Sequence, residues 1–153
     1  YHMIYLKAYH FIDDFKKGEI ANLDNKINII YRNYKQPTNE EKIKRIKKEC
    51  KNSGKKFFLS NNLPLACKLK LDGAYIPSFN KSLNLKYKVK NNFQLIGSAH
   101  NLKEIKIKEK QGVDTIFLSP IFKINKKKLF LDIARFNFLS NLTKKKSCCI
   151  GWY

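Results

Sequence analysis

The chain has 153 residues, of which 43% are hydrophobic, so it can form one domain with a real core and is too short for two. Its formal net charge of +20 raises the question of a nucleic-acid partner. However, its only arginines are Arg32, Arg45 and Arg135, whereas dedicated nucleic-acid surfaces use Arg for bidentate contacts. We therefore interpret the lysines as a solvated coat and expect no specific nucleic-acid partner.

The cysteines and the apolar segments indicate the cellular compartment in which the protein resides. No C-x-x-C pair occurs, and no His lies at zinc-finger spacing, so reduced thiols are expected at Cys50, Cys67, Cys148 and Cys149. No apolar run reaches roughly 18 residues, and the N-terminal stretch lacks the apolar region of a signal peptide. The sequence thus predicts a cytoplasmic protein without a membrane span.

The first third of the chain alternates strand and helix patterns. Leu6–Ile12 and Lys26–Tyr31 are predicted strands. Thr38–Glu41 has the form of a capping box, in which a Thr hydroxyl and a Glu carboxylate satisfy free N–H groups at a helix start. The helix that follows is predicted to stop at Ser53–Gly54.

The middle of the chain continues this alternation with one ambiguous segment. Lys56–Ser60 is a predicted strand, Asn61–Asn62 caps a helix that runs through Leu69, and Ala74–Ser78 is the next strand. In Leu83–Val89 the apolar residues alternate with period two, which by itself indicates a strand. Because a strand there would break the alternation, we expect a short helix or an irregular crossover.

The last part of the chain predicts a parallel unit. Phe93–His100 and Thr115–Phe122 are strand-length apolar runs, and Asn101–Gly112 between them is a charged helix closed by glycine. Leu131–Leu142 is a predicted helix and Ser147–Gly151 a seventh strand. The chain is thus predicted to be a single α/β domain over residues 1–153. Its architecture is an incomplete (β/α) TIM barrel of about seven strands that lacks the last strand and the last two helices.

In such folds the residues just after the strand ends form the functional site. Small residues and hydroxyls that lead into a helix N-terminus suit an anion, because free N–H groups and the helix dipole face it. Ser98 and Ser119 occupy such positions after two neighbouring predicted strands.

Four segments resemble the thiamine phosphate synthase/TenI superfamily of TIM barrels. The first two, FLSNN (Phe58–Asn62) and LDGAYIPSFN (Leu71–Asn80), are similar to a strand that ends in Asn-Asp and to D-G-V-H-L-G-Q-x-D. The other two, LIGSAHNLKEI (Leu95–Ile105) and GVDTIFLSPIF (Gly112–Phe122), are similar to I-G-x-S-x-H-S-x-x-E and G-A-D-Y-I-G-L-G-P-V-F. A fifth segment, IIYRNY (Ile29–Tyr34), is a poorer match to Q-L-R-x-K.

The resemblance implies an enzyme that joins an aminopyrimidine methyl diphosphate to a thiazole phosphate in thiamine biosynthesis. Its partners would be phosphorylated small molecules. The sequence is also compatible with a homo-oligomer. The residues that it implies at the substrate and diphosphate site are Arg32, Asn61, Ser98, His100, Ser119 and Gly151. The family's catalytic lysine falls among Lys126, Lys127 and Lys128. Asn61 has an alternative role as a helix cap.

The chain departs from the family pattern where Mg²⁺ would bind. Asn62 and Asn80 stand in place of the two metal-binding aspartates, and Tyr34 stands in place of the lysine of Q-L-R-x-K. Mg²⁺ prefers anionic oxygens, so we expect a severely weakened metal site. Asp13 and Asp14 follow a predicted strand and are alternative carboxylates.

Three alternative functions are compatible with the sequence. A non-catalytic binder of phosphorylated thiamine precursors needs no metal carboxylates. A thiazole tautomerase-like activity lacks its usual histidine, because Pro120 stands there, unless His100 replaces it. A basic RNA-associated protein is the third alternative.

The final residues suggest a change of reading frame. The segment SCCIGWY (Ser147–Tyr153) matches the family's glycine turn poorly, but one back-translation read one nucleotide later encodes Val-Val-Ala-Leu-Gly-Gly. The lysine codons just before it form an A-rich run in which a base is easily miscounted. We therefore hypothesise that residues 147–153 are an out-of-frame tail and that the barrel continues in the neighbouring frame.

Overall fold

The computed structural model describes residues 8–85, 92–118 and 133–149. Its strands are β1 (Ala8–Ile12), β2 (Ile27–Tyr31), β3 (Phe57–Ser60), β4 (Gly73–Ile76), β5 (Gln94–Ala99), β6 (Thr115–Leu118) and β7 (Lys146–Cys149). Its helices are α1 (Glu19–Asn22), α2 (Glu40–Asn52), α3 (Leu63–Lys68), α4 (Leu102–Lys110) and α5 (Ile133–Asn141).

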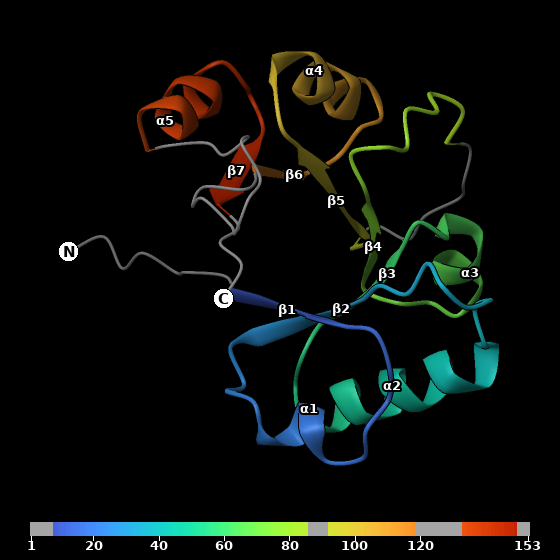
Figure 1. Cartoon of the computed structure of the whole chain (residues 1–153). Coiled ribbons are helices and arrows are strands. Elements are labelled where there is room, and N and C mark those ends of the chain that lie inside the picture. The colour runs from blue at the N-terminus through green and yellow to red at the C-terminus, as the bar shows by residue number, and fades with distance from the viewer. Residues whose placement is uncertain (1–7, 86–91, 119–132, 150–153) are drawn as a thin grey trace.

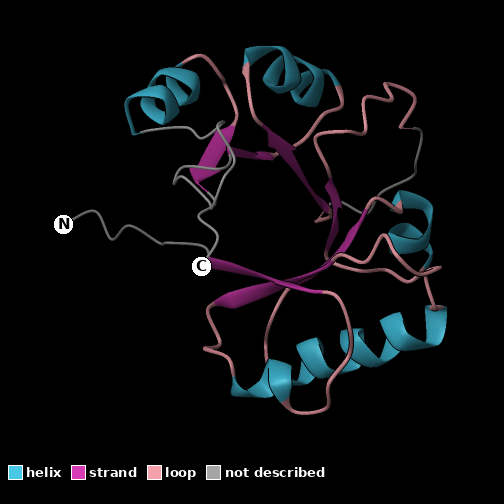
Figure 2. Ribbon diagram, viewed as in Figure 1, coloured by secondary structure: helices cyan, strands magenta, loops and turns pink. Residues whose placement is uncertain are grey.

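The strands form one seven-stranded sheet in chain order, and every neighbouring pair is parallel. The sheet curls around a central space and the helices lie on its outer side (Figures 1 and 2). In the described residues, β1 and β7 are its two edges. The predicted α/β fold, an incomplete (β/α) barrel, is confirmed.

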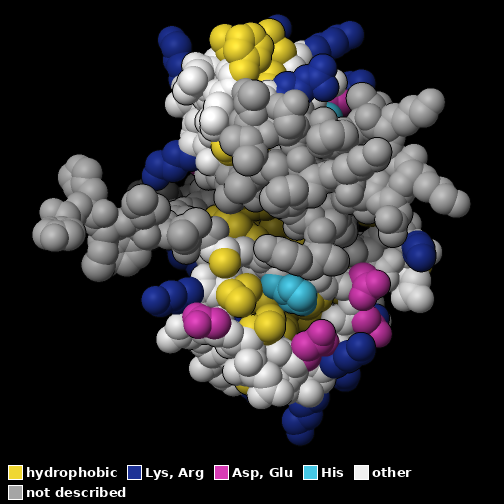
Figure 3. Space-filling view, turned by 60° about the vertical axis from the view of Figure 1, so that its left-hand side comes forward, with side chains coloured by type: hydrophobic (Ala, Val, Ile, Leu, Met, Phe, Trp, Pro, Cys, Tyr) yellow, Lys and Arg dark blue, Asp and Glu magenta, His cyan; other side chains and the backbone are white. Residues whose placement is uncertain are grey.

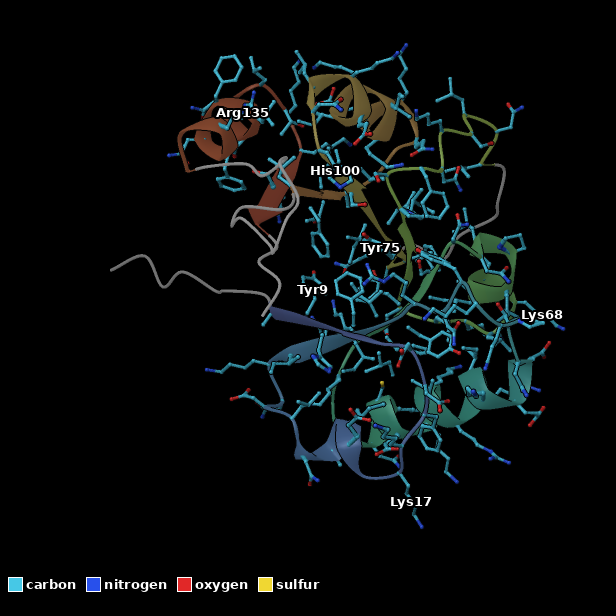
Figure 4. The ribbon with its side chains drawn as sticks, in the orientation of Figure 1. Tyr9, Lys17, Lys68, Tyr75, His100 and Arg135 are labelled. Atoms are coloured by element: carbon cyan, nitrogen blue, oxygen red, sulfur yellow. The ribbon has the colours of Figure 1, made fainter. Side chains whose placement is uncertain are left out.

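Strand alternation divides the core into two layers, because successive side chains of a strand face opposite sides of the sheet. The outer layer lies against the helices and includes Ile43 and Ile46 of α2. The inner cluster holds five buried residues, each from a different strand: Ile30, Phe58, Tyr75, Ile96 and Phe117. Aromatic rings therefore fill much of the barrel interior, and Figure 4 shows Tyr9 and Tyr75 pointing into it.

Asparagine side chains begin three of the helices. Asn39, Asn62 and Asn101 each accept a hydrogen bond from the backbone N–H three residues later, at 3.0 to 3.2 Å. The capping box predicted at Thr38 is therefore wrong. The helix starts one residue later, with Asn39 in extended backbone (φ −92°, ψ 112°) as its cap.

Some lysines depart from the predicted solvated coat. Lys55 and Lys108 are buried. The Lys55 ammonium donates to the carbonyl of Leu23 after α1, and that of Lys47 donates to the carbonyl of Leu69 after α3, so both satisfy helix C-terminal carbonyls. On the face drawn in Figure 3, the basic side chains of the described residues are spread over the surface.

Several predicted features lie outside the described residues. Leu83–Leu85 has no regular structure, and residues 86–91 of the ambiguous segment are not described. Ser119, Pro120, Lys126, Lys127, Lys128 and Gly151 also fall outside. None of the described helices is long and apolar enough to cross a membrane.

Candidate functional site at the carboxyl ends of the strands

The parallel sheet brings the residues that follow its strands to one rim of the barrel. Backbone pairing continues to this rim: the N–H of Arg32 donates to the carbonyl of Ile12, and the N–H of Asn61 donates to the carbonyl of Tyr75, both at 2.8 Å. Arg32 and Asn61, predicted from separate parts of the sequence, therefore lie at the same end of the sheet.

Arg32 and Ser98 meet at the hydroxyl of Tyr75. The Arg32 guanidinium carbon lies 4.3 Å from the centroid of the Phe11 ring, a cation–π contact that holds the cation in place. Burial raises the pKa of Tyr75, and hydrogen bonds from Ser98 and Arg32 act in the opposite direction. Because Arg is only a donor, the phenol oxygen accepts from Arg32, whereas the Ser98 hydroxyl can donate or accept.

Sequence reasoning missed Tyr75. It is only 4% exposed and belongs to the inner cluster, on a strand whose residues are all buried. Nothing in the strand pattern separates a functional phenol from a core aromatic. The one signal that could have identified it is its hydroxyl group, because the other buried residues of the inner cluster have none.

The second polar group at the rim joins Asn61 to Asn80. The Asn80 side-chain amide donates to Oδ1 of Asn61 at 2.8 Å, and Oδ1 of Asn80 accepts from the N–H of Ser82 at 3.1 Å. Asn61 has a φ of +56°, the left-handed region that is uncommon outside glycine. Asparagine adopts this conformation more readily than other residues with a side chain, and here it turns the chain sharply after β3.

An exposed aromatic pair lies beside these amides. The Tyr34 hydroxyl lies 2.6 Å from Oγ of Ser60 at the end of β3, and the Tyr34 and Phe79 rings meet edge to face at 5.3 Å. Tyr34 is 51% exposed and Phe79 is 60% exposed. Where the family pattern has a lysine, this chain therefore presents an anchored ring.

The asparagines at the family's metal positions do not fit Mg²⁺. Oδ1 of Asn62 accepts from the N–H of Leu65 as the cap of α3, and Oδ1 of Asn80 is bonded to Ser82. Both amide oxygens are neutral and each already accepts a hydrogen bond, whereas Mg²⁺ prefers carboxylates.

The alternative carboxylates do not complete a metal site either. Asp14 forms an ion pair with Lys42 at 2.7 Å, which lowers the pKa of Asp14. Asp13 is exposed, and its carbonyl accepts from the side chain of Asn33. Within residues 8–85, 92–118 and 133–149, no group of three or more His, Cys, Asp or Glu side chains could hold a metal ion.

His100 is turned towards its own helix. Its ring Nδ1 lies 2.9 Å from Oε2 of Glu104, and its backbone N–H donates to the same oxygen at 2.7 Å. The described partners of His100 thus belong to the start of α4, and none is Arg32, Tyr75 or Ser98.

Comparison with known proteins identifies a family and individual proteins that are similar to this chain. A model of the family described as thiamine monophosphate synthase matches residues 20–151. The thiamine-phosphate synthase of Bacillus velezensis is 29% identical over 94 residues, which are 60% of this chain and 42% of that protein. The chain thus spans less than half of the length of this curated relative.

Solved structures share the fold. Thiamine phosphate pyrophosphorylase from Pyrococcus furiosus superimposes with a TM-score of 0.74 at 16% identity, over 97% of this chain and 76% of that one. The citrate synthase SbnG gives a TM-score of 0.56 at 8% identity, over 80% and 67% of the two chains. At these identities, the structural likeness supports the barrel architecture alone.

Proposed function

Because the chain belongs to the thiamine monophosphate synthase family, we propose that it binds a phosphorylated precursor of thiamine at the rim that carries Arg32, Tyr75 and Ser98. The observation that supports this proposal is the convergence of Arg32 and Ser98 on one buried phenol. A fixed guanidinium beside two hydroxyls offers charge and directed donors to phosphate oxygens.

Each side chain has a distinct role in this proposal. Arg32, held over Phe11, neutralises part of the diphosphate charge. Tyr75 keeps its proton, because burial raises its pKa, and donates it in a hydrogen bond to a phosphate oxygen. Ser98, at the end of β5, orients the phenol and offers a further hydroxyl.

Binding is supported better than turnover. In the family, diphosphate leaves the pyrimidine before the thiazole nitrogen attacks, and this step needs strong stabilisation of the leaving charge. The described rim has neutral amides at the metal positions, and the lysines proposed as catalytic, Lys126, Lys127 and Lys128, lie outside the described residues. The coupling reaction itself is therefore the second candidate function, and family membership favours it.

Calorimetry with each substrate, followed by a product assay, tests both candidates. The protein is titrated with the aminopyrimidine methyl diphosphate and with the thiazole phosphate, with and without Mg²⁺. Arg32→Gln is expected to weaken diphosphate binding at least about tenfold, because a charge-assisted bidentate contact is lost. The matched control is Arg45→Gln on the exposed side of α2.

The outcomes separate the candidates. Binding without product supports the binder, and product formation supports the synthase. If neither substrate binds, or if Arg45→Gln weakens binding as much as Arg32→Gln, the proposed site is wrong.

A further inference from the structure

We propose that Lys108, which lies in the helical layer outside the barrel, is a positioning residue that fixes the Asn61–Asn80 amide pair at the rim. The proposal rests on the proposed function, because it assigns a supporting group to the same phosphate site. Lys108 does not touch the bound ligand in this proposal. It acts through Asn80.

The first argument is the unusual burial of Lys108. Its side chain is 0% exposed on α4, and lysine is almost never fully buried without partners. The aliphatic stem crosses β5 directly over Gly97: a Cβ on Gly97 would lie 2.7 Å from Cδ of Lys108. Gly97 thus leaves the space through which the lysine passes.

The second argument is the set of hydrogen bonds that the Lys108 ammonium donates. Nζ of Lys108 donates to the carbonyl of Asn80 at 2.7 Å and to Oε1 of Gln111 at 2.8 Å. The Gln111 amide donates to the carbonyls of Asn80 and Ser82, each at 2.9 Å. Two buried side chains of the α4 segment therefore clamp the loop that follows β4.

The third argument connects this clamp to the rim. Asn80 is bound at its carbonyl by Lys108 and Gln111, and its side-chain amide holds Oδ1 of Asn61. The Asn61 amide group has no partner among the described residues, so it is left to contact a ligand. An unclamped Asn80 would no longer hold the side chain of Asn61, which follows β3.

The charge of Lys108 also supports this role. Desolvation lowers the pKa of Lys108 from 10.5 to about 8, while the Glu104 carboxylate raises it and the Lys81 ammonium lowers it. The bonds to Asn80 are charge-assisted only below that pH. Their strength therefore falls as the pH rises through 8.

Calorimetry with inorganic pyrophosphate in the absence of Mg²⁺ tests the proposal on the full chain. Lys108→Met retains the stem and removes the ammonium, and Lys110→Met, an exposed residue of the same helix, is the control. We expect about tenfold weaker binding for Lys108→Met at pH 7, a typical coupling between sites, and no change for Lys110→Met. At pH 9 the ratio of the pyrophosphate dissociation constants of Lys108→Met and wild type should be smaller than at pH 7. The titration of pyrophosphate itself affects both proteins equally and cancels in that ratio.

The result that overturns the proposal is equal affinity of wild type and Lys108→Met at pH 7, or a loss of the same size at both pH values. Gln111→Leu, which removes the other donors to the loop, is expected to weaken binding in the same direction and serves if Lys108→Met does not fold.

A second measurement distinguishes this proposal from the proposed function. In wild-type protein, the NMR signals of the Asn61 and Asn80 side-chain amides should shift with a midpoint near pH 8. The shift should vanish in Lys108→Met. If wild type binds no pyrophosphate but shows this titration, the proposed function fails and the clamp stands. If wild type binds pyrophosphate but shows no titration, the clamp fails.

Discussion

The side-chain amide of Asn80 donates a 2.8 Å hydrogen bond to Oδ1 of Asn61, and so joins the loop after β4 to the residue that follows β3. Asn61 holds a φ of +56° at that point. Both residues carry neutral amides, so the pair contributes geometry to the rim without contributing charge. A phosphate that binds beside it meets donors instead of carboxylates.

Substitution of Asn61 by glycine separates backbone strain from ligand contact. Asn61→Gly relieves the left-handed conformation but loses the amide, so the free energy of unfolding should change by no more than about 1 kcal/mol. Pyrophosphate affinity should fall about tenfold, the loss expected for one hydrogen bond to a charged group. Urea unfolding and calorimetry measure the two effects.

Lys70→Gly is the matched control for this prediction. Lys70 also has a positive φ, +52°, but lies exposed after α3, away from the rim. Its substitution should raise stability by roughly 0.5 to 1 kcal/mol and leave pyrophosphate binding unchanged. Equal losses of affinity in both variants would show that Asn61 has no special role.

Substitution of Gly97 tests the passage of Lys108 across β5. In Gly97→Ala the new Cβ would lie 2.7 Å from Cδ of Lys108 and 3.0 Å from a methyl of Val113. Such overpacking typically costs about 1 to 3 kcal/mol of stability. Part of the loss should be recovered when Lys108→Ala is added. A double-mutant cycle with a coupling energy near zero would contradict the contact.

The buried ammonium of Lys108 should impose a pH dependence on stability. Its pKa is about 8 in the folded chain and 10.5 as its ordinary value, so between these values the unfolded chain binds more protons. Stability therefore rises with pH across this window and is lowest below pH 8. The gain in the free energy of unfolding should be on the order of 3 kcal/mol, at about 1.4 kcal/mol for each pKa unit.

Urea unfolding of wild type and Lys108→Met at pH 7 and pH 10 measures this gain. The free energy of unfolding of wild type should increase relative to that of Lys108→Met as the pH rises from 7 to 10. A difference that stays constant across the window would mean that Lys108 titrates normally in the folded chain.

The sequence predicted the barrel more completely than it predicted the site. Helix and strand periodicity depends on local burial, so each segment that was predicted to be a strand overlaps an observed strand. The period-two pattern of Leu83–Val89, for which a short helix or a crossover was expected, has no regular structure in its described part, Leu83–Leu85. The short helix α1 was missed, because four residues with one buried side chain, Ile20, leave no periodic pattern.

The partners of the site residues depend on three-dimensional packing and could not be predicted. The resemblance implies both Arg32 and Ser98, and Ser98 also follows a predicted strand, but the sequence does not distinguish their common partner Tyr75 from other core aromatics. In the sequence, Lys108 is one of the lysines of a charged helix. Only the packing of α4 over Gly97 shows that it is buried.

Tyr75→Phe tests the phenol at the centre of the rim. The ring packs between Phe11 and Phe117, and phenylalanine should keep that packing, so stability should change by only about 1 kcal/mol. Loss of the hydroxyl removes the link between Arg32 and Ser98 and should weaken diphosphate binding about tenfold. Tyr9→Phe, another aromatic of the interior, is the control in the same calorimetric titration. Unchanged affinity for Tyr75→Phe would exclude the phenol from the site.

Restoring the two carboxylates tests whether their replacement by asparagine removes the need for metal. Pyrophosphate binding to wild type should be nearly independent of Mg²⁺, because the oxygens of Asn62 and Asn80 are neutral and each already accepts a hydrogen bond. Asn62→Asp combined with Asn80→Asp should make binding depend on Mg²⁺ by at least about tenfold, since hard cations favour carboxylates. Aspartate is as good a helix cap as asparagine, so α3 should form in the variant. Calorimetry with and without Mg²⁺ measures the change, and a wild type that already requires Mg²⁺ would contradict a metal-free site.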